Sequence, residues 1–172
     1  FRMFYTGLSR KEDGKIQRIG LARSNDLYHW EKVSAASYPL SITGPHYVED
    51  ISEGRNWVSC RDPFFFNEGS TRMLLVNARV PFGPIARRGC IGTAKETAPD
   101  IFQWERPIFF PRMYDDVEVP GLYRIKGRYY LFGNIKEDVK VHYWYSNSLD
   151  DDFEAFTSNV LLPKGNYAAR IT

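Results

Sequence analysis

A short pattern occurs three times in this chain of 172 residues, and it constrains the fold more than any other feature. The first copy, residues 19–31, reads IGLARSNDLYHWE, and the second, residues 91–105, reads IGTAKETAPDIFQWE. A fainter third copy spans residues 141–154, with Phe153 in the place of the tryptophan. Each copy combines a run of strand-forming residues, a turn built on Asp or Asn, and a second run led by a large aromatic residue. The pattern therefore predicts a repeated unit made of β-strands.

Each of the later copies follows another pair of strand-like segments, so the predicted unit is a four-stranded antiparallel sheet. Helical periodicity is hard to find between these segments, which makes the chain all-β. In the middle unit we expect strands at residues 58–67, 72–78, 89–95 and 102–107. In the next unit we expect them at residues 118–125, 128–135, 139–146 and 153–161.

Tandem four-stranded sheets with a repeat of roughly 40 to 75 residues are typical of a β-propeller, whose blades pack face to face around a channel. The innermost strand of each blade lines that channel. The alternative is a β-sandwich, in which Trp30 and Trp104 are ordinary core residues and the repeats are accidental. The self-similarity favours the propeller.

Charged side chains occur at the starts of two of the predicted innermost strands. Arg61 and Asp62 interrupt the otherwise apolar run of residues 57–66, and Glu118 lies in the run of residues 115–123. Charges among aromatic residues cost several kcal/mol unless they are paired or hydrogen-bonded, so they indicate a concave functional site. In a propeller these three side chains would converge from neighbouring blades on one axial pocket.

Composition excludes several classes of function. The 23 basic and 21 acidic residues nearly cancel and are spread along the chain, which argues against a nucleic-acid partner. The longest apolar runs fall far short of the ~20 residues that cross a bilayer, so we expect no membrane span. Three scattered histidines and two cysteines form no zinc-like cluster, and we expect neither a metal nor a cofactor. Cys60 and Cys90 either form a disulfide or, as their apolar flanks favour, are two buried free thiols.

Four segments occur in order along the chain. They are Tyr5-Thr-Gly7 with the first repeat copy, Arg61-Asp-Pro63, Glu118-Val-Pro120 and Tyr167-Ala-Ala-Arg170. Together they resemble glycoside hydrolase family 32, the invertase and levanase group, and its relatives among the family 43 arabinanases and xylosidases. Arg61-Asp-Pro63 and Glu118-Val-Pro120 resemble the openings of that family's third and fourth blades. The chain departs from the family at Val119, where Cys is usual, and at Gly121, where Asp is usual.

The resemblance implies a five-bladed β-propeller that is incomplete in this chain. Residues 1–172 would be part of one catalytic domain, covering blades two to four and lacking the first blade and most of the fifth. The chain starts without Met and stops inside a strand-like segment, which agrees with a fragment. The family's nucleophile is an Asp in an Asn-Asp-Pro segment; this chain has no such segment, so we expect the nucleophile upstream.

Carried over to matching positions, the resemblance makes Glu118 the general acid and Asp62 the group that stabilises the transition state and binds ring hydroxyls. Arg61 would orient Asp62 and the sugar. Asp115 or Asp116 could fill the acid role instead of Glu118 by a small shift along the strand. We also expect aromatic side chains, Trp57 and Tyr114 among them, to stack on the sugar.

The resulting functional prediction is a secreted or periplasmic enzyme that hydrolyses β-fructofuranosidic bonds of sucrose or fructan with retention, its partner being a carbohydrate substrate. An inverting arabinan- or xylan-directed hydrolase and a glycoside phosphorylase are alternatives on the same fold. A non-catalytic sugar-binding propeller is the alternative from another class. The sequence leaves the oligomeric state open.

Overall fold

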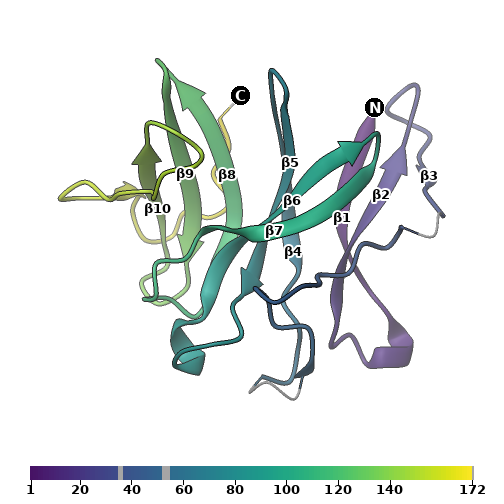
Figure 1. The fold of residues 1–172 in the computed structure, drawn as a ribbon, viewed down its shortest axis with the longest axis horizontal. Helices are drawn as coiled ribbons and strands as arrows, with labels where there is room; N and C mark the ends of the chain where they lie inside the picture. Colours follow the sequence, from purple (N-terminus) through teal and green to yellow (C-terminus); the bar gives the residue numbers. More distant parts are fainter. Residues whose placement is uncertain (35–36, 52–54, 172) are drawn as a thin grey trace.

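The structure, a computed structural model, describes residues 1–34, 37–51 and 55–171. It contains three antiparallel sheets that lie side by side, with the second sheet between the first and the third (Figure 1). The first sheet has the order β1 (Arg2–Leu8), β2 (Gln17–Arg23), β3 (Glu31–Lys32). The second has the order β4 (Arg61–Glu68), β5 (Thr71–Arg79), β6 (Gly89–Ala98), β7 (Ile101–Phe109). The third comprises β8 (Val117–Ile125), β9 (Arg128–Ile135), β10 (Lys140–Ser146), β11 (Val160–Leu162), again in chain order across the sheet.

The prediction of an all-β chain with four-stranded antiparallel sheets is confirmed. Helical residues in the described part form short 3-10 turns, η1 (Arg10–Glu12) and η3 (Ile85–Arg87), and none is a helix long and apolar enough to cross a membrane. One predicted strand is wrong. Residues 153–161 form a strand only from Val160, and Glu154 makes a single bridge to Tyr145. Phe153 packs on the ring of Phe109, with 6.5 Å between centroids, and the segment bonds to the backbone of β10 only at Glu154 and Asn159 before the strand begins.

Strand β5 of the second sheet is buried on both faces from Met73 to Arg79. Its residues alternate: Leu74 and Val76 face the first sheet within one hydrophobic cluster. Met73 and Leu75 face the third sheet within the other cluster. Side chains of a strand point to opposite faces in turn, so a strand between two packed sheets is mainly apolar on both faces. This layering of sheets is the blade packing of a propeller.

The repeated Ile-Gly pair has a structural cause. Ile91 is fully buried, and Gly92 lies where a Cβ atom would come within 3.0 Å of the Cβ of Ala78 and 3.1 Å of the ring of Tyr47. At the matching Gly20 a Cβ would overlap the ring of Tyr5. Both glycines therefore let an aromatic ring lie flat against the sheet, which explains why the pattern recurs.

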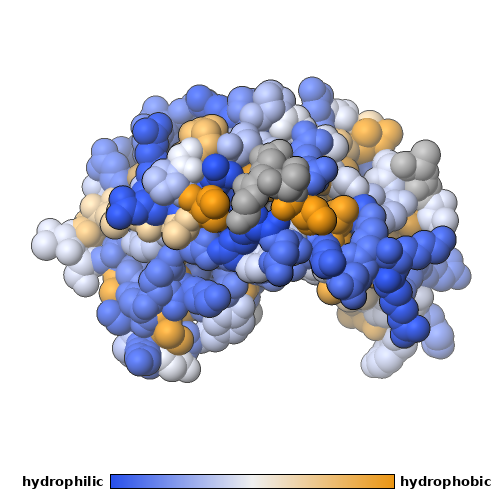
Figure 2. Space-filling view, turned by 90° about the horizontal axis from the view of Figure 1, so that it is seen from below, coloured by the Kyte–Doolittle hydropathy of each residue, from blue (hydrophilic) through white to orange (hydrophobic). Residues whose placement is uncertain are grey.

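The cysteine prediction is confirmed: Cys60 and Cys90 are free and buried in the cluster between the first and second sheets. Burial raises the pKa of Cys60 to about 12, which makes this thiol unreactive near neutral pH. Seen from below, the molecule is an arch whose two ends enclose a hollow, with a mainly hydrophilic surface (Figure 2).

Candidate functional site

The strands β4 and β8 open with the same backbone distortion. Asp62 and Val119 both have positive φ, 58° and 49°, and each precedes a proline. In β4 the pairing with β5 shifts between Arg61 and Phe64, and in β8 the pairing with β9 shifts between Glu118 and Gly121. Proline has no N–H to give to a ladder, so the distortion takes the form of a bulge. The segments Arg61-Asp-Pro63 and Glu118-Val-Pro120 therefore share the same bulge, which changes the direction of the neighbouring side chains.

This device brings the predicted acids together. Nη2 of Arg61 donates a hydrogen bond to Oε1 of Glu118 at 2.8 Å, and Nε of Arg61 lies 3.7 Å from Oδ2 of Asp62. The same Oδ2 accepts the backbone N–H of Val119 at 3.1 Å. The three side chains keep between 15% and 24% of their surface exposed. Two acids from neighbouring sheets therefore share one arginine and remain within reach of a ligand.

A third carboxylate, that of Asp116, also lies beside this arginine. Asp116 is two residues before Glu118, is buried to 3% side-chain exposure, and has Oδ2 3.5 Å from Nη2 of Arg61. Nη1 of Arg55 lies 3.9 Å from the same Oδ2, and Nη1 of Arg79 lies 3.8 Å from Oδ1. Its Oδ1 has no hydrogen-bond partner among the described residues. Asp116 holds the arginine group in place and has too little exposed surface to be the proton donor.

Asp115 belongs to the structural part of this network. Arg79 donates to its Oδ1 at 2.7 Å, and Arg55 forms an ion pair with its Oδ2. Arg79 also donates to the carbonyl oxygen of Ile85, which ties down the loop between β5 and β6. Burial, together with the nearby Arg55, lowers the pKa of Arg79 to about 10.

The C-terminal segment closes over Glu118. The Tyr167 hydroxyl donates to Oε2 of Glu118 at 3.3 Å, and Nη1 of Arg170 donates to the carbonyl oxygen of Val119 at 3.1 Å. Burial raises the pKa of Tyr167, and the negative charge of Glu118 adds to the effect, so the hydroxyl stays a donor. Both oxygens of Glu118 are thereby oriented, one by Arg61 and one by Tyr167.

The electrostatics of Asp62 suit a group that meets a developing positive charge. Burial raises its pKa, while the Val119 N–H and Arg61 oppose the rise and Glu118 adds to it. An ionised carboxylate in such a partly dehydrated place is poorly solvated, so it gains from a cationic or hydroxyl-rich ligand. The arrangement can grip vicinal hydroxyls and stabilise an oxocarbenium-like ring.

The two aromatic candidates lie in different surroundings. The Trp57 ring lies 4.3 Å from the guanidinium of Arg55, and its Nε1 donates to Oγ of Ser59, which also accepts from Arg61 at 3.2 Å. Trp57 therefore adjoins the arginine group. The ring of Tyr114 packs instead between the second and third sheets, 6.4 Å from the ring of Trp144. Stacking of either ring on a sugar stays a prediction.

Sequence reasoning missed several members of the site. Asp116 was weighed only as an alternative acid, although its place two residues before Glu118 puts it on the same side of the strand start. Tyr167 and Arg170 were part of the family resemblance without a role in the site. No signal in the sequence indicates Thr6, whose Oγ1 accepts the Asp62 N–H at 3.1 Å.

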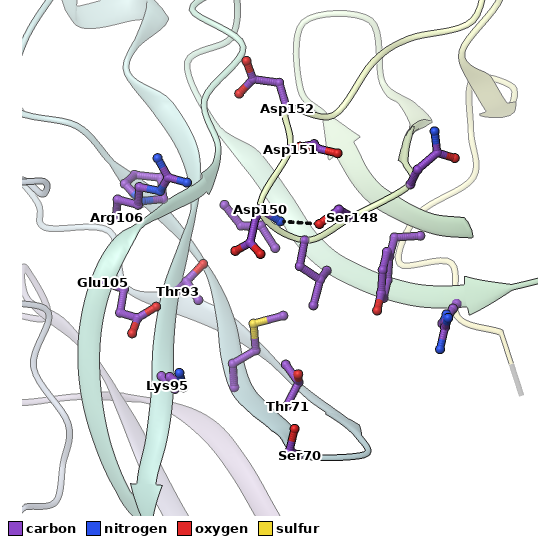
Figure 3. Close-up of a pocket in the computed structure, with 17 residues that line it drawn as sticks. Ser70, Thr71, Thr93, Lys95, Glu105, Arg106, Ser148, Asp150, Asp151 and Asp152 are labelled. Atoms are coloured by element: carbon purple, nitrogen blue, oxygen red, sulfur yellow. Dashed lines mark hydrogen bonds between the residues drawn. The ribbon is translucent and has the colours of Figure 1, made fainter. Parts of the chain in front are cut away.

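A separate groove of about 530 Å³ lies between the outer parts of the second and third sheets (Figure 3). In it Asp150, Asp151 and Asp152 come from the loop after β10 and lie opposite Arg106 and Glu105 of β7. Arg61, Asp62 and Glu118 do not line it. The groove is thus distinct from the cluster that the sequence predicted.

No protein-family model matches the chain, and no curated protein matches it. Solved structures do. A levansucrase of B. megaterium superposes with a TM-score of 0.71 at 17% identity, covering 94% of this chain and 50% of that one. An inulosucrase from Halalkalicoccus jeotgali bound to kestose gives 0.70 at 18% identity, with 95% and 48% covered, and a levansucrase from Bacillus subtilis gives 0.70 at 18%, with 94% and 51% covered.

The chain spans about half the length of these solved structures. At such low identity the likeness concerns the fold alone. Together with the three packed sheets, it shows that the described residues adopt part of the β-propeller fold found in levansucrases and an inulosucrase.

Proposed function

We propose that this chain contributes the acid and transition-state-stabilising half of a glycoside-cleaving site that acts on β-fructofuranosides such as sucrose and fructan. The observation that carries the proposal is the shared arginine: Arg61 contacts both Asp62 and Glu118, so two carboxylates from adjacent sheets meet at one place. Glycoside hydrolysis uses an acid and a second carboxylate on opposite sides of the bond that breaks; Glu118 is the proposed acid of that pair, and Asp62 is a further carboxylate beside it. The similar solved structures, a levansucrase and an inulosucrase bound to kestose, support the choice of substrate class.

In this proposal Glu118 gives its proton to the glycosidic oxygen as the bond to the anomeric carbon breaks. Tyr167 and Arg61 hold the two carboxyl oxygens of Glu118 so that the acid keeps one orientation. Asp62 binds ring hydroxyls and stabilises the positive charge that develops on the ring. A carboxylate nucleophile, expected upstream of Phe1, would attack the anomeric carbon from the opposite face, and water would then release the sugar.

Replacing Glu118 by Gln in the complete protein that carries this chain tests the assignment. Sugar release from sucrose and inulin should fall by about 10²–10⁴-fold, because a positioned general acid contributes that much. The matched control is Glu31→Gln, on the exposed strand β3, which should leave the rate unchanged. An unchanged rate in Glu118→Gln would show that another group is the acid.

The same assay separates the alternatives. Release of arabinose or xylose from the corresponding polysaccharides, with no action on sucrose, would favour the inverting hydrolases. Cleavage that depends on added phosphate would favour a phosphorylase. Sugar binding without cleavage by the complete protein would favour a non-catalytic sugar-binding propeller.

A further inference from the structure

Three residues with positive φ, Asp62, Val119 and Ala168, donate their backbone N–H to a side chain of a preceding sheet. The N–H of Asp62 donates to Oγ1 of Thr6 in the first sheet at 3.1 Å. The N–H of Ala168, which also has positive φ, donates to Oδ1 of Asn134 in the third sheet at 3.2 Å. In both cases a polar side chain of one sheet accepts the N–H of a positive-φ residue that comes later in the chain.

Thr6 and Asn134 occupy equivalent positions, and Asn77 is their counterpart in the second sheet. Thr6 pairs with Ile19 and Asn77 pairs with Ile91, which are the first residues of the first two repeat copies. Asn134 pairs with the first residue of the third copy. By this equivalence Asn77 should accept the N–H of the strand start in the third sheet, which belongs to Val119.

The bond at this junction goes elsewhere. The Val119 N–H donates to Oδ2 of Asp62 at 3.1 Å. Asn77 is fully buried, and neither its Nδ2 nor its Oδ1 finds a hydrogen-bond partner among the described residues. It lies two residues from Leu75, on the face of β5 that packs against the third sheet. A buried amide with no partner costs free energy and calls for an explanation.

We propose that Asn77 is a positioning residue that accepts the Val119 N–H when a sugar engages both oxygens of Asp62. The inference rests on the proposed function of Asp62. A sugar hydroxyl that binds Oδ2 of Asp62 competes with the Val119 N–H for that oxygen, and the N–H then needs another acceptor. Asn77 supplies that acceptor, as Thr6 and Asn134 do at the other two junctions.

Thr6 suggests a matched pair of variants, Asn77→Thr and Asn77→Val. The two side chains have nearly the same shape, and only threonine can accept a hydrogen bond. In the complete protein, kcat/KM of Asn77→Val should fall about tenfold, with the melting temperature without sugar equal to that of wild type or higher. Asn77→Thr should keep the wild-type kcat/KM. A purely structural role would instead lower the melting temperature.

A second readout follows the N–H itself. Hydrogen exchange at the Val119 amide, measured in saturating fructose, should stay slow in the wild type and in Asn77→Thr and become faster in Asn77→Val. If Asn77→Val folds poorly, the pair Asn77→Ser and Asn77→Ala repeats the comparison with smaller side chains.

Two results overturn the inference: an unchanged kcat/KM in Asn77→Val, or an equal loss in Asn77→Thr. Either of them, seen with an active wild type, leaves the proposed function intact. A wild-type protein that cleaves none of the glycosides above refutes the proposed function, and this inference with it.

Discussion

The junction between the first and second sheets and the junction between the second and third differ at their inner ends. Both are filled by buried apolar side chains, with Leu74 facing one and Leu75 facing the other. At the first junction the strand start is held by the neutral hydroxyl of Thr6. At the second it is held by the carboxylate of Asp62, close to two further acids that share Arg61.

Apolar side chains pack the sheets together at both junctions, whereas the cluster of charged side chains that forms the candidate site occurs at the second junction. The second junction leaves the amide of Asn77 and one oxygen of Asp116 without hydrogen-bond partners among the described residues. It also leaves Asp62 with a raised pKa, first because of its burial. Buried polar atoms without hydrogen-bond partners and shifted pKa values are concentrated at functional sites, where activity is often gained at the expense of stability.

The largest expected effect concerns activity at the second junction. Asp62→Asn in the complete protein should lower the rate of sugar release by about 10²–10³-fold, since a preorganised group that stabilises developing charge is worth that much. The amide oxygen of Asn can still accept the Val119 N–H, so the fold should be kept. Initial rates on sucrose, with circular dichroism as the check on folding, give the answer; a rate within about twofold of wild type would refute the role.

The packing of the two junctions should respond alike to loss of a leucine. Leu74→Ala and Leu75→Ala should each lower the free energy of unfolding by about 2–5 kcal/mol, because both side chains are fully buried. Denaturant unfolding of the two variants provides the measurement. A cost confined to one of them would show that only one junction is a close-packed interface.

A smaller effect should distinguish the two strand-start links. Thr6→Val removes an acceptor that is in use and should lower the free energy of unfolding by about 1–2 kcal/mol. Asn77→Val removes an amide without a partner and should leave the stability unchanged or raise it. Equal losses in both variants would mean that the two junctions are linked in the same way.

The smallest effect is a pH dependence. Burial raises the pKa of Asp62 above its ordinary value of 3.8, so the folded state binds its proton more tightly than the unfolded chain does. The stability that this group contributes is therefore complete below that value and is lost as the pH rises through the raised pKa. Asp62→Asn should lose less stability than wild type as the pH rises above 3.8. Parallel stability curves for the two proteins would contradict this.

Much of the fold was predictable because the repeat and the alternation of apolar residues report directly on strands. The meeting of Asp62 and Glu118 was predictable for the same reason, since both begin innermost strands. The hydrogen-bond partners of individual atoms could not be predicted from the sequence. Alternation says which face Asn77 lies on, but only the bulges at Asp62 and Val119 decide which acceptor takes the N–H. The strand predicted at residues 153–161 failed because the burial of Phe153 took precedence over β-propensity.

The most direct measurement is a crystal structure of the complete Glu118→Gln variant soaked with sucrose. The account predicts a furanosyl ring with hydroxyls at about 2.7 Å from the Asp62 carboxylate and the glycosidic oxygen within hydrogen-bond reach of residue 118. A sucrose molecule bound only in the outer groove of Figure 3, with Asp62 still holding the Val119 N–H and no sugar beside it, would contradict it.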